Sequence, residues 1–219
     1  MDWTALAVTL KLAAWTTVIL LVLGLPLAYW LVTMRWRGKF LIEAVVALPL
    51  VLPPTVLGYY LLMATGPNSY LGEGVESLTG ERLPFTFLGI LVGSVLFNLP
   101  FAVRPFAAAF LSVDRKLIEA SWCLGESRLG TFFRIVMPLS WPGIFTGMIL
   151  TFAHTVGEFG VVLMVGGNIP GVTRTLSIAL YDDVQAMQYE AAGETALLLV
   201  AFSFAALCII HFFQRRVVL

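Results

Sequence analysis

The sequence predicts an all-α integral membrane protein, and three observations lead to this fold class. Of the 219 residues, 59% are hydrophobic and only 12% are charged, and the mean hydropathy is +0.93. A soluble domain lies nearer half apolar and a quarter charged, so a single core of this size cannot bury the excess. Charge-free windows of about twenty residues recur along the chain, which is the length that a helix needs to cross a bilayer. Because backbone groups in lipid must be paired within their own segment, these windows should be helices.

The charge-free windows predict a bundle of five membrane-spanning helices in one domain, 1–219. The predicted spans are 12–32, 44–64, 83–103, 135–157 and 195–214. The segment before the last span begins with the apolar run FGVVLMVGG, so a sixth, short crossing stays open as an alternative. The chain starts MDWTALAVTLK, without a basic region or a small-residue cleavage site, and we expect the first span to be retained. The segment GPNSYLGEGVESLTGER predicts an irregular loop.

Lysine and arginine residues predict the orientation of the bundle. The chain has thirteen of them and a formal net charge of zero, with no basic tail that would indicate a nucleic-acid partner. In this topology three fall on one side: Lys11, Arg82 and Arg174. Ten fall on the other: Arg35, Arg37, Lys39, Arg104, Arg115, Lys116, Arg128, Arg134, Arg215 and Arg216. The basic side is expected to be cytoplasmic, with the N-terminus outside and the C-terminus inside.

Proline residues interrupt several of the predicted spans. Each removes a backbone hydrogen bond and favours a kink, although neighbouring helices can accommodate a single proline in a membrane. The pair Pro53–Pro54 is expected to break the second span near the middle of the membrane, where transport proteins often line a path. The other prolines within spans or at their ends are Pro26, Pro49, Pro100, Pro105 and Pro142.

The basic segment 112–134 predicts two short helices that meet at a glycine. Asp114 is a suitable N-cap for a helix over 115–124, and Gly125 suits the left-handed position that ends a helix. A second helical piece is expected over 126–136. The apolar side chains of this corner require a cover. From the residues alone, the cover is either the membrane surface or a cytoplasmic partner.

The same segment resembles the signature of the permease subunits of ABC importers. That signature reads E-A-A, three residues, G, nine residues, then I-x-L-P. The matching residues are Glu119, Ala120, Ser121, Gly125, Ile135, Met137 and Pro138. Ser121 and Met137 are mild departures from the pattern. The resemblance favours the partner over the membrane surface.

The resemblance implies a type I ABC importer permease fold (MetI-like) with a cytoplasmic coupling helix. It implies a homodimer of permease subunits in the cell (inner) membrane, two cytoplasmic ABC ATPase subunits and an external substrate-binding protein. By this resemblance Glu119, Ala120, Ser121, Gly125 and Pro138 would form the ATPase-coupling site. The chain has no G-x-x-x-x-G-K-[ST] motif, so ATP and Mg²⁺ are expected in the partner ATPase, with no cofactor in this chain. No catalytic or metal site is predicted.

Two further segments narrow the resemblance, which covers nearly the whole chain. LPLVLPPTVLGYYLL (48–62) and GEFGVVLMVGGNIPGVTRTLSIALY (157–181) resemble the permeases for molybdate and sulfate, and are nearer the molybdate type. The implied function is import of molybdate or tungstate. A sulfate or thiosulfate permease of the same family and an ATPase-independent oxyanion carrier are the alternatives.

Few polar residues could line a path or gate for an anion. Arg104 is either a path residue or an anchor on the basic side, and Glu158 is a structural or gating residue because a carboxylate repels an anion. Arg174 offers positive charge beside hydroxyl groups, or belongs to a solvated loop, and His154 is expected to be a packing residue. The full set of candidate pathway or gate residues is Pro53, Pro54, Arg104, Glu158, Asn168, Thr173, Arg174 and Thr175.

Overall fold

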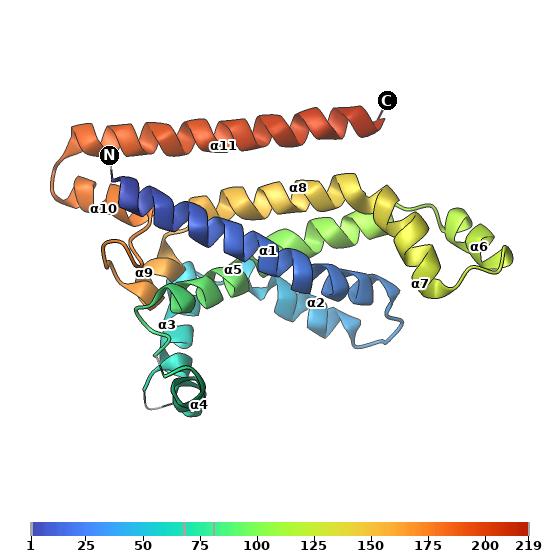
Figure 1. Ribbon diagram of the computed structural model, residues 1–219, viewed down its shortest axis with the longest axis horizontal. Coiled ribbons are helices and arrows are strands. Elements are labelled where there is room, and N and C mark those ends of the chain that lie inside the picture. Colours follow the sequence, from blue (N-terminus) through green and yellow to red (C-terminus); the bar gives the residue numbers. More distant parts are fainter. Residues whose placement is uncertain (1, 68, 81, 219) are drawn as a thin grey trace.

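The computed structural model describes residues 2–67, 69–80 and 82–218, and every regular element in these ranges is a helix. The helices form an elongated bundle (Figure 1), with the N-terminus at one end and the C-terminus toward the other. Among the described residues, four helices are long and apolar enough to cross a membrane, or five when one bent pair counts as a single span. This all-helical membrane architecture confirms the predicted fold class.

Three long helices make the centre of the bundle. They are α1 (Trp3–Thr33), α5 (Phe87–Leu111) and α8 (Met137–Val156), and each packs against the other two. Their shared core holds Leu20 and Phe106, both 1% exposed. The core is therefore built where three apolar helices meet, and the outward faces of the helices stay apolar as lipid requires.

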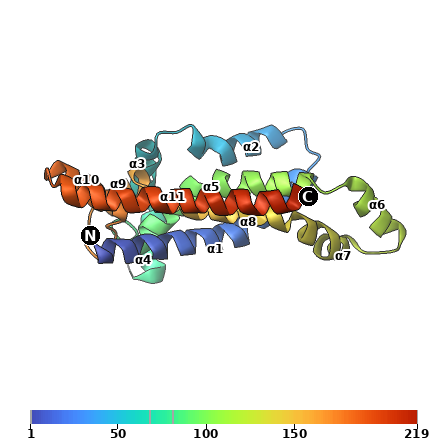
Figure 2. The same cartoon turned by 90° about the horizontal axis from the view of Figure 1, so that it is seen from above.

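The second span is broken, as the Pro53–Pro54 pair predicts. Helix α2 (Lys39–Ala47) continues as the 3₁₀ turn η1 (Leu48–Leu50), and α3 (Pro54–Thr65) starts after a bend of 106°. Proline cannot donate to the preceding turn and disfavours helical geometry in the residue before it, so one straight helix cannot pass this point. In Figure 2, α5 lies between α1 and α2.

The fourth span is longer than expected. Helix α7 (Arg128–Thr131), the π-helical turn η2 (Phe132–Val136) and α8 follow one another without a break, and Pro138 lies in the first turn of α8. Proline is tolerated there because its missing N–H has no partner in that turn. The expected second short helix over 126–136 is therefore wrong in its end, because the chain runs on into the span.

The connecting segments correct one further expectation and bear on one open alternative. The expected loop between the second and third spans contains a helix, α4 (Tyr70–Thr79), because Ser69 caps its N-terminus and Gly80 ends it in the left-handed conformation. A sixth crossing is absent from the described chain. Helices α9 (Gly160–Gly166) and α10 (Leu176–Gln185) are at most ten residues long, or about 15 Å, half of the hydrocarbon thickness. The last described helix is α11 (Tyr189–Val218), which packs on α8 and α10.

Candidate functional site

The first candidate site is the corner between α6 (Arg115–Cys123) and α7, which projects from one end of the bundle (Figure 1). The Asp114 carboxylate accepts the backbone N–H of Lys116 at 2.9 Å, which is the predicted N-cap. Gly125 has φ +84°, the left-handed region that a residue with a side chain rarely adopts. A Cβ added to Gly125 would meet nothing within 4 Å. The backbone conformation alone, and not a lack of space, therefore favours glycine at this position.

A small set of polar contacts holds the corner in shape. The hydroxyls of Ser121 and Thr131 share a buried hydrogen bond of 3.0 Å that joins α6 to α7. Arg134 Nη1 lies 2.7 Å from Glu126 Oε2 across the turn. These contacts explain why one position of the signature, Ser121, carries a hydroxyl, since it has a buried partner within the corner.

The outer surface of the corner is apolar and uncovered. Four large side chains are between 46% and 89% exposed: Trp122, Leu124, Leu129 and Phe133. Glu119 is exposed as well and is paired with Arg115 of its own helix at 2.8 Å. An exposed apolar group beside solvated charges is typical of a protein interface.

Aromatic rings join the corner to the long helices. The ring of Phe132, in η2, lies 4.5 Å from that of Tyr29 in α1 and 6.1 Å from that of Phe110 in α5, measured between centroids. A π-helical turn widens the helix at this point, and such turns often occur at functional positions. The base of the corner is therefore in contact with two of the three central helices.

The second candidate site is a buried polar cluster at the break between α8 and α9. Glu158 is 4% exposed, and its Oε2 accepts the hydroxyl of Ser94 at 2.6 Å and the amide of Asn98 at 3.0 Å. Asn98 Oδ1 lies 2.8 Å from His154 Nδ1. Glu158 Oε1 has no hydrogen-bond partner within the described part of the chain. The cluster therefore fixes the α8–α9 break to the middle of α5.

Half of this cluster was not predicted from the sequence. Glu158 was a candidate and His154 was expected to be a packing residue, whereas Ser94 and Asn98 were not among the candidates. A signal existed, because Ser94 and Asn98 are four residues apart inside an apolar window and so share one face of a helix. Their shared partner Glu158 is 64 residues from Ser94 and 60 from Asn98 in the chain, so only the tertiary structure reveals the cluster.

A hollow of about 580 Å³ lies beside this cluster. It is lined by Pro54 and Thr55 from the start of α3 and by His154 and Glu158. The structure thus brings together three of the predicted pathway residues, because Pro53 directly precedes the first turn of α3. Arg104 is apart from them, on the exposed side of α5.

The third group of predicted residues lies at the opposite end of the bundle from the corner. Arg174 donates from Nε to Asn168 Oδ1 at 2.6 Å and lies 3.2 Å from Asp182. The Thr173 hydroxyl is buried and bonded to the carbonyl of Gly166, and Thr175 is 1% exposed. Both hydroxyls are buried inside the protein. The two threonines are therefore not part of a solvated loop, the alternative that the sequence left open, and Asn168 is a partner of Arg174.

Asp2 completes this end of the bundle. Its carboxylate caps α1 by accepting the backbone N–H groups of Thr4 and Ala5, each at 3.0 Å. The hydroxyl of Thr4 is the largest of the causes that lower the pKa of Asp2 below its ordinary value of 3.8. Arg174, 3.9 Å away, adds a smaller effect in the same direction.

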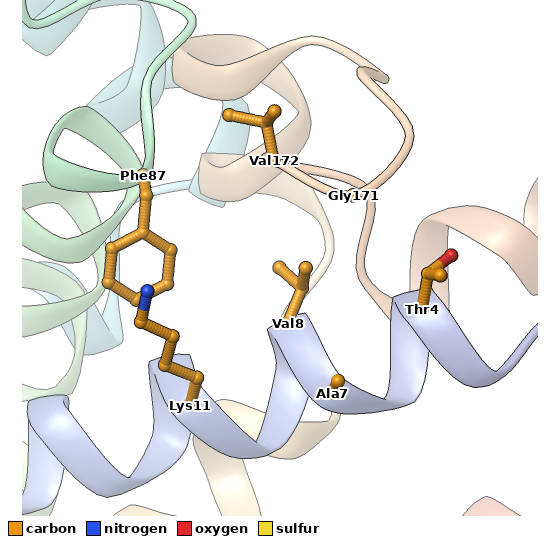
Figure 3. Close-up of a pocket in the computed structure, with 7 residues that line it drawn as sticks. All are labelled: Thr4, Ala7, Val8, Lys11, Phe87, Gly171 and Val172. Carbon is orange, nitrogen blue, oxygen red and sulfur yellow. The ribbon is translucent and has the colours of Figure 1, made fainter.

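A second hollow, of about 350 Å³, separates the start of α1 from the turn at Gly171–Val172 (Figure 3). The Lys11 side chain lies against the Phe87 ring (Figure 3), and its ammonium is 4.3 Å from the ring centre. A cation over an aromatic face is stabilised by the electrons of the ring. Lys11 therefore makes a cation–π contact with α5 and is not simply a solvated charge.

Comparison with known proteins identifies the family. Residues 10–218 match the family described as "Binding-protein-dependent transport system inner membrane component". The chain belongs to this family. It is therefore a multi-pass membrane component of a transport system and not a catalytic subunit.

Individual relatives give further detail. A "Molybdenum transport system permease protein" of Azotobacter vinelandii is 50% identical over 98% of this chain and 95% of its own length. A "Probable sulfate transport system permease protein" of Chlorella vulgaris is 28% identical over 96% of this chain and 79% of its own. A solved bacterial alginate ABC transporter superposes with a TM-score of 0.77 at 16% identity, over 98% of this chain and 78% of that one. This last similarity shows the fold alone.

Proposed function

We propose that this chain is the permease subunit of an ATP-driven importer of molybdate. The observation that carries the proposal is the 50% identity, over nearly the full length of both chains, to a molybdenum transport permease. The sulfate relative is 28% identical, and molybdate and sulfate are both tetrahedral dianions. Relatives of this chain thus include permeases for both anions. The higher identity to the molybdenum permease favours molybdate, or its close analogue tungstate, as the substrate of this chain.

Two copies of the chain would enclose the path, and two ATPase subunits would dock on the two corners. The corner fits this role because it combines an uncovered apolar surface with a fixed turn at Gly125. ATP and Mg²⁺ would be held by the ATPase. When the ATPase dimer closes, the two corners approach each other, and the contacts of Phe132 carry that displacement to α1 and α5.

The orientation follows from the distribution of charge. The corner carries Arg115, Lys116, Arg128 and Arg134, and basic residues concentrate on the cytoplasmic side. The C-terminal end of α11 is directed toward the end of the bundle that carries the corner, and the N-terminus lies at the other end (Figure 1). We therefore place the chain in the cell (inner) membrane with its N-terminus outside and its C-terminus in the cytoplasm. The external binding protein would then dock at the end that carries Arg174.

Uptake by the reconstituted complex tests the proposal. Vesicles that hold this chain with its ATPase and binding protein should accumulate molybdate only when ATP is supplied, and a tenfold excess of sulfate should leave the rate unchanged. Substituting Gly125→Glu should abolish uptake while the chain still inserts in the membrane. Uptake without ATP would identify an oxyanion carrier, and uptake blocked by sulfate would identify a sulfate permease.

A further inference from the structure

Lys11 is the one charged residue within α1, and it lies on the outward face of that helix. Val8 and Leu12 face inward and are at most 7% exposed, whereas Trp15, one turn beyond Lys11 on the outward face, is 51% exposed. Because the residues around Lys11 on this face are apolar, the face is suited to contact lipid. An ionisable group on such a surface is a candidate for a specific interaction.

The position of Lys11 along α1 places its ammonium at the level of the lipid headgroups. The charge-free segment 12–32 begins at the next residue, and Arg35 and Arg37 follow it. At about 1.5 Å per residue, this segment is about 30 Å long, which equals the thickness of the hydrocarbon layer. The segment therefore fills the hydrocarbon, and Lys11 lies at its edge, where a lysine extends its ammonium toward the phosphates.

The charge of Lys11 is not matched by a carboxylate within the described part of the chain. The other two basic residues at this end of the bundle, Arg82 and Arg174, lie 3.1 Å and 3.2 Å from carboxylate oxygens. Lys11 instead lies over the ring of Phe87. A ring face contacts one side of an ammonium group, which carries three N–H donors. Lys11 therefore keeps donors and a positive charge for a ligand.

The hollow of about 350 Å³ lies beside this ammonium (Figure 3). Ala7, Val8 and Phe87 give it a mostly apolar lining, and Thr4 adds a hydroxyl. Thr4, Ala7 and Lys11 are exposed on the outward face of α1, so the hollow opens toward the lipid. Its volume equals that of about a dozen waters, which is room for a phosphate and a small alcohol.

We propose that this hollow takes the headgroup of an anionic phospholipid, with the phosphate bonded to Lys11 Nζ and the acyl chains lying along the outward face past Trp15. Charge decides the class of lipid. An anionic headgroup neutralises the unmatched ammonium, whereas a zwitterionic headgroup brings a second cation beside it. The bound lipid joins α1 to the start of α5, in the leaflet nearer the N-terminus. This inference goes beyond the proposed function and does not depend on the substrate.

Accessibility of a cysteine in the hollow tests the proposal. Cys123 and Cys208 are free and exposed, so each is first changed to serine. Val172→Cys then places one thiol in the lining of the hollow. Val184→Cys on α10 is the matched control, because Val184 lies outside the lining and is 43% exposed, against 40% for Val172. Each variant, assembled with its ATPase in nanodiscs, is labelled with an uncharged maleimide in phosphatidylcholine, with or without phosphatidylglycerol.

We expect phosphatidylglycerol to slow labelling of Val172→Cys about fivefold, the effect of one lysine near an anionic membrane surface. The rate at Val184→Cys should not change. Lys11→Met should remove the protection because it keeps an unbranched stem without the charge, and Lys11→Arg should keep it because a guanidinium also donates to phosphate. Arg82→Gln removes a basic residue that is paired with a carboxylate, and should leave the protection unchanged.

The other occupants of the hollow give different results. Protection that persists in Lys11→Met, or that is as strong in phosphatidylcholine alone, would overturn the proposal. Slow labelling in both lipids and in every Lys11 variant would show that a protein surface covers the hollow, and would overturn it as well. Protection of Val172→Cys by molybdate in phosphatidylcholine would assign the hollow to the oxyanion and not to a lipid. None of these readouts requires transport, so this proposal and the proposed function can fail separately.

Discussion

Gly125 offers the sharpest test of the corner as a docking element. An alanine at φ +84° is in the left-handed region, which costs about 1–2 kcal/mol for a residue with a Cβ. In the free chain the turn can relax, because nothing lies within 4 Å of the added Cβ. A docked ATPase would select the observed turn, so the cost appears in binding. We expect Gly125→Ala to raise the Kd of the ATPase by about 5–30-fold.

Gly80 is the matched control for this experiment. It has φ +74°, and a Cβ added to it likewise meets nothing within 4 Å, but it ends α4 and not α6. Titration of the ATPase against the permease in nanodiscs should give an unchanged Kd for Gly80→Ala. Asparagine tolerates the left-handed region better than alanine, so the Kd of Gly125→Asn should lie between the values for the unaltered chain and for Gly125→Ala. Unchanged binding by Gly125→Ala, or equal weakening by both alanine variants, would refute the reasoning.

Three further predictions concern stability. Ser121→Ala leaves the buried hydroxyl of Thr131 without its partner, and should lower the free energy of unfolding by about 1–3 kcal/mol, measured by thermal unfolding in detergent. Gly58→Ala places a Cβ 2.6 Å from the Cβ of Met164 in α9 and should lower the free energy of unfolding by about 1–3 kcal/mol. Gly193→Ala is the control and should leave the free energy of unfolding unchanged, because an added Cβ there meets nothing within 4 Å. The pKa of Asp2 is lowered by folding, so its stabilisation is complete above its ordinary value of 3.8 and is lost as the pH falls through the folded value. Amide exchange in the first turn of α1, compared at pH 6 and pH 3 after correction for the intrinsic rate, should be faster at pH 3; no change would refute this.

The sequence predicted those features that depend on local chemistry. The charge-free windows indicated the long helices, the Pro53–Pro54 pair indicated the break, and Asp114 and Gly125 indicated the ends of α6. Each of these follows from what one or two adjacent residues allow the backbone to do. Helix α4, which was expected to be a loop, could have been predicted in the same way, since Ser69 and Gly80 are its caps.

The features that were missed depend on contacts between distant segments. The polar cluster forms only because α5 and the α8–α9 break lie side by side. The residues adjacent to Glu158 in the sequence do not indicate that Asn98 is its partner. The burial of the Thr173 and Thr175 hydroxyls also results from tertiary packing. The second short helix was ended too early because the π-helical turn lets the chain enter α8 without a break. The roles of the corner and pathway residues stay predictions until they are measured.

The break between η1 and α3 has a consequence for hydration. Three residues, Val51 to Pro53, separate the two helices without forming part of either, and Val51 is 84% exposed. Within a bilayer, irregular backbone survives only where protein covers it or where water reaches it, because lipid tails offer no hydrogen bonds. The N–H groups of Val51 and Leu52 bond to the carbonyl of Leu48 and Pro53 has none, so the carbonyl oxygens of the bend are the groups that favour a polar surface over lipid here. The side of the subunit that carries the bend is the one that meets either a second protein surface or an aqueous cavity, whatever the ligand that passes there.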